Sequence, residues 1–260
     1  MIGWSGQLWF SGRMDDELDF RANRLFVDAP LDEGGTCQIS RDQANYLINV
    51  LRLGNGGQIL VFNGRDGEWL ASVETQGRRD ATLRLHRQVR AQASGPDVHY
   101  WFAPLKRSRL DYMVQKATEL GVGALQPVMT RRTVAERVNI ERMQANVIEA
   151  AEQCGVLRLP EVRAPISLAK LLAAVDPYRA LIFCDEGAPI ADPVAALRAV
   201  PPGPLAFLIG PEGGFDPAER EALLALPAVT RLSLGPRIMR ADTAAVAALA
   251  LINAVLGDWH

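Results

Sequence analysis

The sequence predicts an α/β protein in which a C-terminal parallel sheet follows a small β-barrel-like domain. From residue 99 onward, short apolar runs alternate with helical stretches, which is the pattern of consecutive βα units. Residues 24–89 instead hold short β-like runs separated by glycine. Residues 91–97, AQASGPD, have the composition of a linker. We therefore predict a barrel domain at residues 23–90 and an α/β domain at residues 96–260, after a loosely ordered extension at residues 1–22.

The predicted barrel combines β-like runs with one helix. The runs alternate apolar and polar residues, or stay apolar for a few positions, as short strands do. They begin at Arg24 (RLFVDA), Gly57 (GQILVFNG), Glu68 (EWLASVE) and Ala81 (ATLRLHRQV). The helix is expected over residues 41–51, where Ser40 is available as its N-cap.

The predicted α/β domain alternates strands and helices along the chain. Its strands are short apolar runs, as expected where helices cover both faces of a sheet. We expect strands at residues 99–103, 124–130, 179–184, 205–209 and 229–235. We expect helices at residues 108–120, 139–154, 193–200, 217–226 and 243–257. Asp216, with Glu219 completing a capping box, is expected to begin the fourth helix, and Asp242 or Thr243 to cap the last.

The composition is that of an ordinary globular protein, with 48% apolar and 22% charged residues. The formal net charge is −2, so any surface that binds nucleic acid must be local. Cys37, Cys154 and Cys184 lie far apart, which argues against a metal site and fits a reducing cytoplasm. Residues 244–256 form the most apolar late stretch, shorter than the roughly 18 residues that a membrane span requires. The start of the chain lacks the basic region of a signal peptide.

A glycine-rich loop follows the apolar run at residues 205–209. The stretch LIGPEGGFDPAER places Gly210, Gly213 and Gly214 between a strand and a helix. Their spacing differs from the dinucleotide fingerprint, and the loop lacks the lysine of a P-loop. Because the loop carries Glu212 and no cation, it suits a ligand with a positive centre or hydrogen-bond donors. The alternative is an ordinary tight turn without a ligand.

A second loop of similar design precedes the last helix. In LSLGPRIMRADTA, a strand end is followed by Gly235 and then by residues 236–243. Ligands of open α/β sheets bind at the carboxyl ends of the strands, so the two loops are expected to converge on one crevice. On spacing alone, two unrelated turns remain the alternative.

Together the two loops resemble the paired signature of the SPOUT superfamily, and more narrowly that of the bacterial 16S ribosomal RNA uridine N3-methyltransferases. The resemblance extends over residues 24–259. The stretches that carry it are RLFV, LINVLRL, FNGRDGEW, FAPLKRSRLDYMVQKATELGV, EAAEQCG, LIGPEGGF and LSLGPRIMRADTA. It implies a PUA-like RNA-binding barrel and a C-terminal α/β domain with a deep trefoil knot. It also implies S-adenosyl-L-methionine as cofactor, 16S rRNA of the small ribosomal subunit as substrate, a homodimer and no metal.

The resemblance also implies which residues form the site. Glu212 and Asp242 are candidates for the group that removes the N3 proton, and Arg240 for stabilising the charge that develops on the uracil. Arg240 could instead grip phosphate or pair with Asp242. The cofactor pocket is expected to be lined by Leu208, Ile209, Gly210, Pro211, Glu212, Gly213, Gly214, Leu232, Leu234, Gly235, Arg237, Ile238, Met239 and Thr243.

Local clusters of basic residues offer phosphate contacts despite the acidic total charge. The RNA-binding candidates are Arg24, Arg52, Lys106, Arg109, Lys116, Arg131, Arg132 and Gln153. Phe26, Phe62 and Trp69 could stack on bases. The alternative is that the arginines serve solubility and the aromatic rings fill the barrel core.

Two positions depart from the family pattern. Val156 stands where arginine is common after EQCG, with Arg158 two residues later, and Asp242 stands where glutamate is usual. The first departure leaves room for an RNA-binding ribosome-assembly factor without catalysis. A SPOUT methyltransferase that acts on another RNA, such as transfer RNA, is the other alternative.

Overall fold

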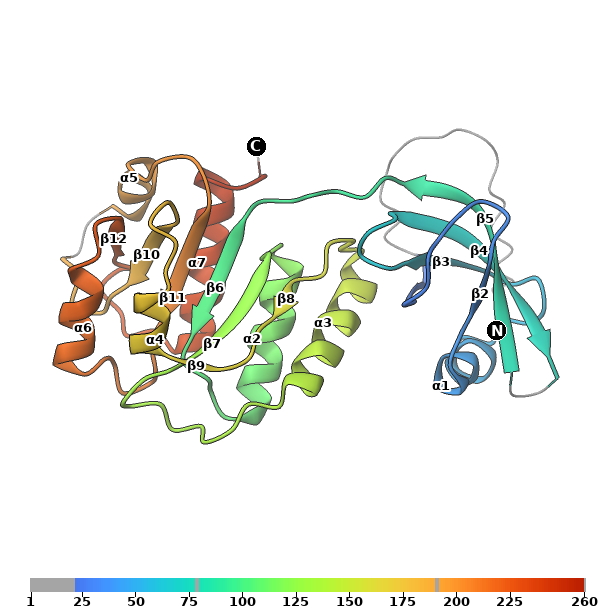
Figure 1. Ribbon diagram of the computed structural model, residues 1–260, viewed down its shortest axis with the longest axis horizontal. Coiled ribbons are helices and arrows are strands. Elements are labelled where there is room, and N and C mark those ends of the chain that lie inside the picture. Colours follow the sequence, from blue (N-terminus) through green and yellow to red (C-terminus); the bar gives the residue numbers. More distant parts are fainter. Residues whose placement is uncertain (1–21, 78–79, 190–191, 260) are drawn as a thin grey trace, which may run out of the picture. The chain divides into compact units, whose positions relative to one another are not determined.

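The computed structural model describes residues 22–77, 80–189 and 192–259 (Figure 1). The chain divides into two compact units between Ala91 and Gln92, and each unit has its own hydrophobic core. The extension expected at residues 1–22 lies outside the described residues except for Ala22. Within the described residues, no helix is long and apolar enough to cross a bilayer.

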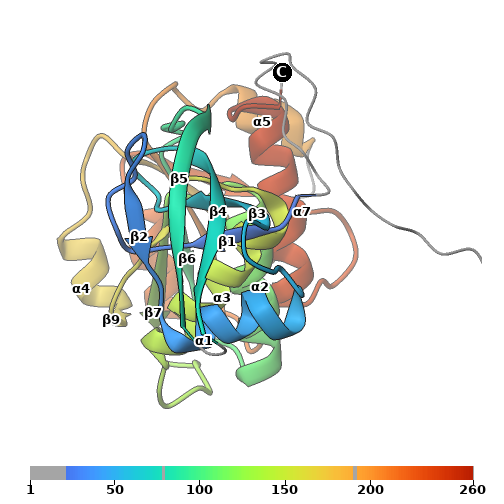
Figure 2. The same ribbon diagram turned by 90° about the vertical axis from the view of Figure 1, so that its right-hand side faces the viewer.

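The N-terminal unit is a five-stranded sheet in the order β1-β3-β4-β5-β2. β1 pairs with β3 in parallel, and the other neighbours are antiparallel. Figure 2 shows β2, β5 and β4 side by side, with α1 at one end of the strands. The elements are β1 (Arg24–Phe26), β2 (Thr36–Gln38), α1 (Arg41–Asn45), a π-helical turn (Tyr46–Val50), β3 (Gln58–Phe62), β4 (Glu68–Gln76) and β5 (Asp80–Arg90).

The helix of the N-terminal unit begins where the sequence predicts. The Ser40 hydroxyl accepts a hydrogen bond from the Gln43 backbone N–H, and the Gln43 side chain accepts one from Ser40 N–H. This reciprocal arrangement satisfies two N–H groups that a helix start leaves unpaired. The predicted helix over residues 41–51 differs in one respect, because its second half winds as the π-helical turn. The three-residue strand β2 was not predicted.

The C-terminal unit is built on a parallel sheet in the order β12-β10-β11-β6-β7-β8, with β9 beside β7. The strands are β6 (Val98–Phe102), β7 (Ala124–Met129), β8 (Glu161–Val162), β9 (Ile166–Ser167), β10 (Ala180–Cys184), β11 (Leu205–Ile209) and β12 (Val229–Leu232). The helices are α2 (Arg107–Glu119), α3 (Ile140–Cys154), α4 (Leu168–Ala173), α5 (Pro193–Arg198), α6 (Pro217–Leu224) and α7 (Ala241–Val255). The short elements β8, β9 and α4 were not predicted, because two to six residues show no clear periodicity.

Helices cover both faces of this sheet, which explains why its strands read as continuous apolar runs. One core joins the sheet to α2, α3, α5 and α7, and a second core joins the opposite face to α4 and α6. In the first core, the rings of Tyr100 on β6 and Phe207 on β11 stack with centroids 4.4 Å apart. The Tyr100 hydroxyl donates to the Met113 sulfur of α2, so the ring's one polar atom has a partner inside the core.

The helix ends confirm most of the predicted caps. Asp216 accepts from Ala218 N–H at the start of α6, with Glu219 completing the capping box. The predicted cap of α7 is wrong. Its N-cap residue is Arg240, which makes no capping bond, and Asp242 and Thr243 lie inside the first turn. The carboxylate of Asp242 still lies at the positive end of the helix dipole, where a negative charge is stabilising.

Candidate functional site

A pocket of about 540 Å³ lies where β10, β11 and β12 end. β10 lies between β12 and β11 in the sheet, so the loops that follow these three strands surround one space. Parallel strands end at the same edge of a sheet, and crevices at that edge hold the ligands of open α/β folds. The two glycine loops predicted to converge therefore line one pocket.

Most of the predicted cofactor residues lie at this pocket. Those that line it are Ile209, Gly210, Pro211, Glu212, Gly214, Leu232, Leu234, Gly235, Arg237, Ile238 and Met239, and Arg240 lines it as well. Leu208, Gly213, Thr243 and Asp242 do not. Leu208 points from β11 into the core on the α4 and α6 face, because neighbouring strand residues point to opposite sides.

Two of the three loop glycines are disfavoured for substitution, one by a close contact and the other by its backbone conformation. A Cβ atom on Gly210 would lie 2.4 Å from the Phe215 ring. Gly214 has a φ of +67°, and a Cβ there would lie 2.3 Å from the Glu186 carboxylate. Gly213 differs, since the nearest atoms to an added Cβ belong to Arg132 at 3.8 Å. A Cβ atom is therefore disfavoured at Gly210 by the Phe215 ring and at Gly214 by the positive φ, whereas it fits at Gly213.

The third wall of the pocket is formed by residues 184–188 after β10 and was not predicted from the sequence. Asp185 holds this loop, because its side chain is 2% exposed and bonded to Arg220, Arg231 and the Gly187 backbone. Burial raises the pKa of Asp185, but the hydrogen bonds from these three partners lower it by more than burial raises it. The pKa of Asp185 therefore lies below its ordinary value. An aspartate directly after a buried strand was the signal available in the sequence.

The side chains of the site favour neither a reactive cysteine nor a metal centre. Burial raises the pKa of the Cys184 thiol to about 12, so this pocket residue is not a reactive thiolate at neutral pH. Among residues 22–77, 80–189 and 192–259, no group of three or more His, Cys, Asp or Glu side chains is arranged to hold a metal ion.

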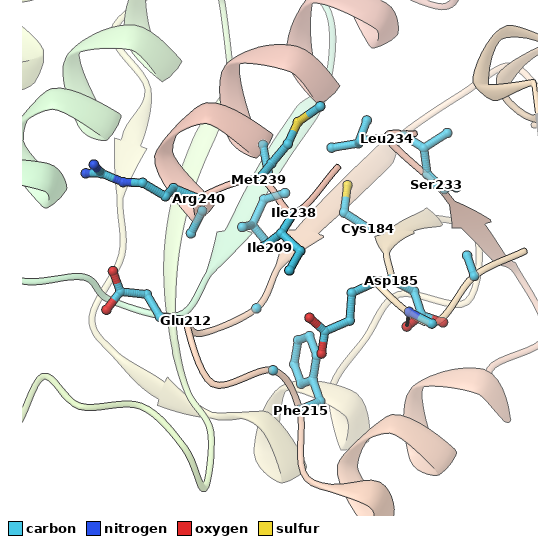
Figure 3. Close-up of a pocket in the computed structure, with 18 of the residues that line it drawn as sticks. Cys184, Asp185, Ile209, Glu212, Phe215, Ser233, Leu234, Ile238, Met239 and Arg240 are labelled. Carbon is cyan, nitrogen blue, oxygen red and sulfur yellow. Dashed lines mark hydrogen bonds between the residues drawn. The ribbon is translucent and has the colours of Figure 1, made fainter. Parts of the chain in front are cut away.

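Charged side chains meet at one side of the pocket. In Figure 3, Glu212 and Arg240 lie on the side opposite to Cys184, Asp185 and Ser233. Arg240 is 60% exposed and donates to Asp242 at 3.2 Å, while Glu212 accepts from Arg109 on α2. The Asp242 carboxylate also accepts from Thr243 N–H. Glu212 is therefore the candidate base that lines the pocket, whereas Asp242 lies in the first turn of α7 and does not line it.

The RNA-binding candidates separate into three groups. Arg24 is wrong as an RNA contact, because its side chain is 2% exposed and pairs with the buried Glu68. Others bind protein groups: Lys116 pairs with Glu119, and Arg109, Arg131 and Arg132 bond to residues 212–219. Arg52, Lys106 and Gln153 are exposed.

The aromatic candidates favour the packing alternative. Phe62 is fully buried and meets Phe26 edge to face, with centroids 5.8 Å apart. The indole N–H of Trp69 donates to the Asp66 carbonyl at 2.8 Å. Near the unusual Val156 position, Arg158 donates to the Pro96 carbonyl at 2.9 Å, and whether it replaces the missing arginine is not tested.

This fold and pocket define a class of protein. Residues 93–253, in the C-terminal unit, match the RNA methyltransferase domain family, and residues 39–85, in the N-terminal unit, match the RNA methyltransferase PUA domain family. The molecule is thus a two-domain RNA methyltransferase in architecture. The chain belongs to the ribosomal RNA small subunit methyltransferase E family. It is 33% identical to the Synechocystis member over 241 residues, covering 90% of this chain and 78% of the relative. It is 29% identical to the Rickettsia conorii member over 233 residues, covering 89% and 95%.

Solved structures support the same assignment. A methyltransferase of Legionella pneumophila in complex with bound S-adenosylmethionine is 28% identical, with a TM-score of 0.80 over 92% of this chain and 99% of that one. The small subunit methyltransferase E of Neisseria gonorrhoeae, bound to S-adenosyl methionine, is 26% identical, with a TM-score of 0.80 over 92% and 100%. The C-terminal unit has a SPOUT-like methyltransferase fold and the N-terminal unit is PUA-like. The threading of the chain through a trefoil knot stays a prediction.

Proposed function

We propose that this protein transfers a methyl group from S-adenosylmethionine to N3 of a uridine in 16S rRNA of the small ribosomal subunit. The observation that carries the proposal is the convergence of the two glycine loops on one pocket with Glu212 and Arg240 at its side. Family membership supports the substrate class, and the resemblance to uridine N3-methyltransferases supports the position on the base.

The pocket suits this cofactor. Its volume of about 540 Å³ is that of a site for a small organic ligand. Ile209, Leu234 and Met239 offer apolar surface for a purine, and the glycines let backbone groups approach it. Charges of both signs line the pocket, namely Asp185, Glu186 and Glu212 together with Arg220, Arg237 and Arg240. S-adenosylmethionine brings an electrophilic methyl group on a positively charged sulfur.

The residues of the chain would supply the acid–base chemistry. Uridine N3 carries a proton that must leave before its lone pair can bond to carbon. We assign Glu212 as the acceptor of this proton, because Glu212 lines the pocket and Asp242 does not. Arg240 is assigned to the negative charge that spreads onto the uracil oxygens as the proton leaves. The target base must be unpaired or flipped for N3 to be accessible.

We propose two partners for this chain, rRNA and a second copy of the chain. The PUA-like unit would bind rRNA, with Arg52 among its exposed basic residues. We also propose a homodimer, because α7 is apolar around most of its circumference. Equilibrium sedimentation at micromolar concentration should show the dimer.

The test is to incubate the protein with small ribosomal subunits that lack the modification and to locate any added methyl group. We expect one methylated uridine, modified at N3, and cofactor binding by calorimetry that persists in the presence of chelator. Cofactor binding without methyl transfer would instead support an assembly factor, the reading that Val156 favours. Transfer to another RNA would overturn the assigned substrate.

A further inference from the structure

Arg109 and Glu212 form an ion pair across the C-terminal unit. Arg109 lies in the first turn of α2, and its guanidinium donates to the Glu212 carboxylate in the loop after β11. The side chains are 38% and 45% exposed. Within the described part of the chain, this is the one hydrogen bond that the Glu212 carboxylate accepts. The position of this carboxylate thus depends on a residue outside the pocket.

The same loop and the start of α6 are held by other residues. Arg132 donates to the Gly213 carbonyl at 2.8 Å, and Arg131 donates to the Asp216 carboxylate at 3.0 Å. The Arg131 backbone N–H also donates to Glu219. Removing Arg109 would leave these bonds in place. Arg109 therefore acts on the side chain of Glu212 rather than on the path of the loop.

We infer that Arg109 is a positioning residue that directs the Glu212 carboxylate toward the substrate base. This inference rests on the proposed function, in which Glu212 receives the N3 proton. A free glutamate side chain samples many rotamers, and proton transfer requires one of them at hydrogen-bond distance from N3. A half-exposed ion pair adds little to the stability of a fold, so orientation is the main effect of this pair.

The sequence alone favours a different role for Arg109, which is contact with RNA phosphate. Arg107 provides a matched comparison, because it lies two residues away in the same first turn and is exposed. Its charge helps to lower the pKa of Asp111, four residues further along α2. Loss of a phosphate contact raises the KM for RNA and leaves kcat unchanged at saturation. Loss of orientation lowers kcat.

The experiment compares Arg109→Ala, Arg109→Lys and Arg107→Ala on unmodified small subunits, with cofactor affinity measured by calorimetry and folding by circular dichroism. We expect Arg109→Ala to lower kcat by about 10-fold or more while cofactor affinity stays within about twofold. Arg109→Lys keeps a cationic donor and should recover most of this loss. Arg107→Ala should retain the wild-type kcat.

A double-mutant cycle separates positioning from any independent effect. With Glu212→Gln in place, adding Arg109→Ala should lower kcat by less than about twofold further, because the group that Arg109 directs is already lost. If the loss of kcat in the double variant equals the product of the losses in the two single variants, the inference is overturned. An unchanged kcat in Arg109→Ala overturns it as well. If the wild-type protein transfers no methyl group, the proposed function fails and this inference fails with it. Wild-type transfer with an unaffected Arg109→Ala variant contradicts the inference alone.

Discussion

The guanidinium of Arg231 on β12 donates at 2.9 Å to the buried carboxylate of Asp185, a residue that lines the pocket. Asp185 follows β10, so this bond joins the ends of two neighbouring strands. Arg220 of α6 donates to the same carboxylate at 2.8 Å. One buried charge therefore holds together three elements that carry the walls of the pocket.

Replacing Asp185 with asparagine keeps its size and removes its charge. We expect the variant to lose about 1–3 kcal/mol of unfolding free energy, because the hydrogen bonds from two arginines are weakened. Cofactor affinity should fall as well, since residues 184–188 lose their attachment. Urea unfolding and calorimetry measure the two effects. Glu161→Gln, at an exposed pair with Arg163, is the control and should cost less than about 1 kcal/mol. Equal effects of the two variants would contradict this role of Asp185.

His99 is expected to make stability depend on mildly acidic pH. Its neighbours are Asp97, Glu161, Arg163 and Arg179, and burial, then Arg179 and Arg163, lower its pKa from 6.5 to about 4. Between these two pH values the unfolded chain binds the proton and the folded chain does not. Stability contributed by His99 is thus complete above pH 6.5 and is lost as the pH falls toward 4.

The measurement for His99 is the urea midpoint from pH 7.5 to 4.5. His99→Gln should reduce the loss of stability on acidification, whereas the exposed His86→Gln should reproduce the wild-type curve. A His99→Gln curve parallel to that of the wild type would show that this histidine does not contribute.

The loop glycines provide a steric test of the cofactor site. Gly210→Ala should weaken S-adenosylmethionine binding by 10-fold or more, about 1.4 kcal/mol, because the added methyl meets the Phe215 ring and displaces the loop. Gly213→Ala has room and should bind within about twofold of wild type, although the resemblance places Gly213 in the pocket. Calorimetry distinguishes the two. If Gly213→Ala loses as much affinity as Gly210→Ala, the cofactor contacts the other side of the loop.

Arg240 is expected to act in the transition state. Arg240→Ala should lower kcat by about 100-fold or more while cofactor affinity is retained, as for other single donors that stabilise developing charge. Arg240→Lys keeps the charge but loses the planar fork, and should recover activity only in part. A residue that merely grips phosphate would show weaker RNA binding with kcat preserved at saturation. Wild-type turnover in both variants would exclude a catalytic role.

We expect the C-terminal unit to bind the cofactor and the N-terminal unit to bind RNA. A chain that begins at Pro96 should keep its cofactor affinity, because every residue that lines the pocket lies between Cys184 and Ala244. It should lose methylation of the small subunit, since the RNA-binding unit is gone. RNA binding by the full chain should weaken steeply with salt, as phosphate contacts require. Full activity in the shortened chain would refute the division.

The glycine loops and most elements could be predicted because local signals specify them. Asp216, Pro217 and Glu219 mark the start of α6, and continuous apolar runs mark the central strands. Side-chain partners could not be predicted, since they arise from strand order. Nothing near Arg24 in the sequence shows that it pairs with Glu68, which is 44 residues away, or that Arg109 reaches Glu212. Asp185 was missed for the same reason, because its partners follow it by 35 and 46 residues.

The position of β10 between β12 and β11 has a consequence for synthesis. Translation proceeds from the N-terminus, so the N-terminal unit and most of the large sheet are complete before residues 229–244 have been made. Until they arrive, β10 has one free edge and the pocket lacks an entire wall. We therefore expect the nascent chain to bind no ligand in this pocket until residues 229–244 have left the ribosome.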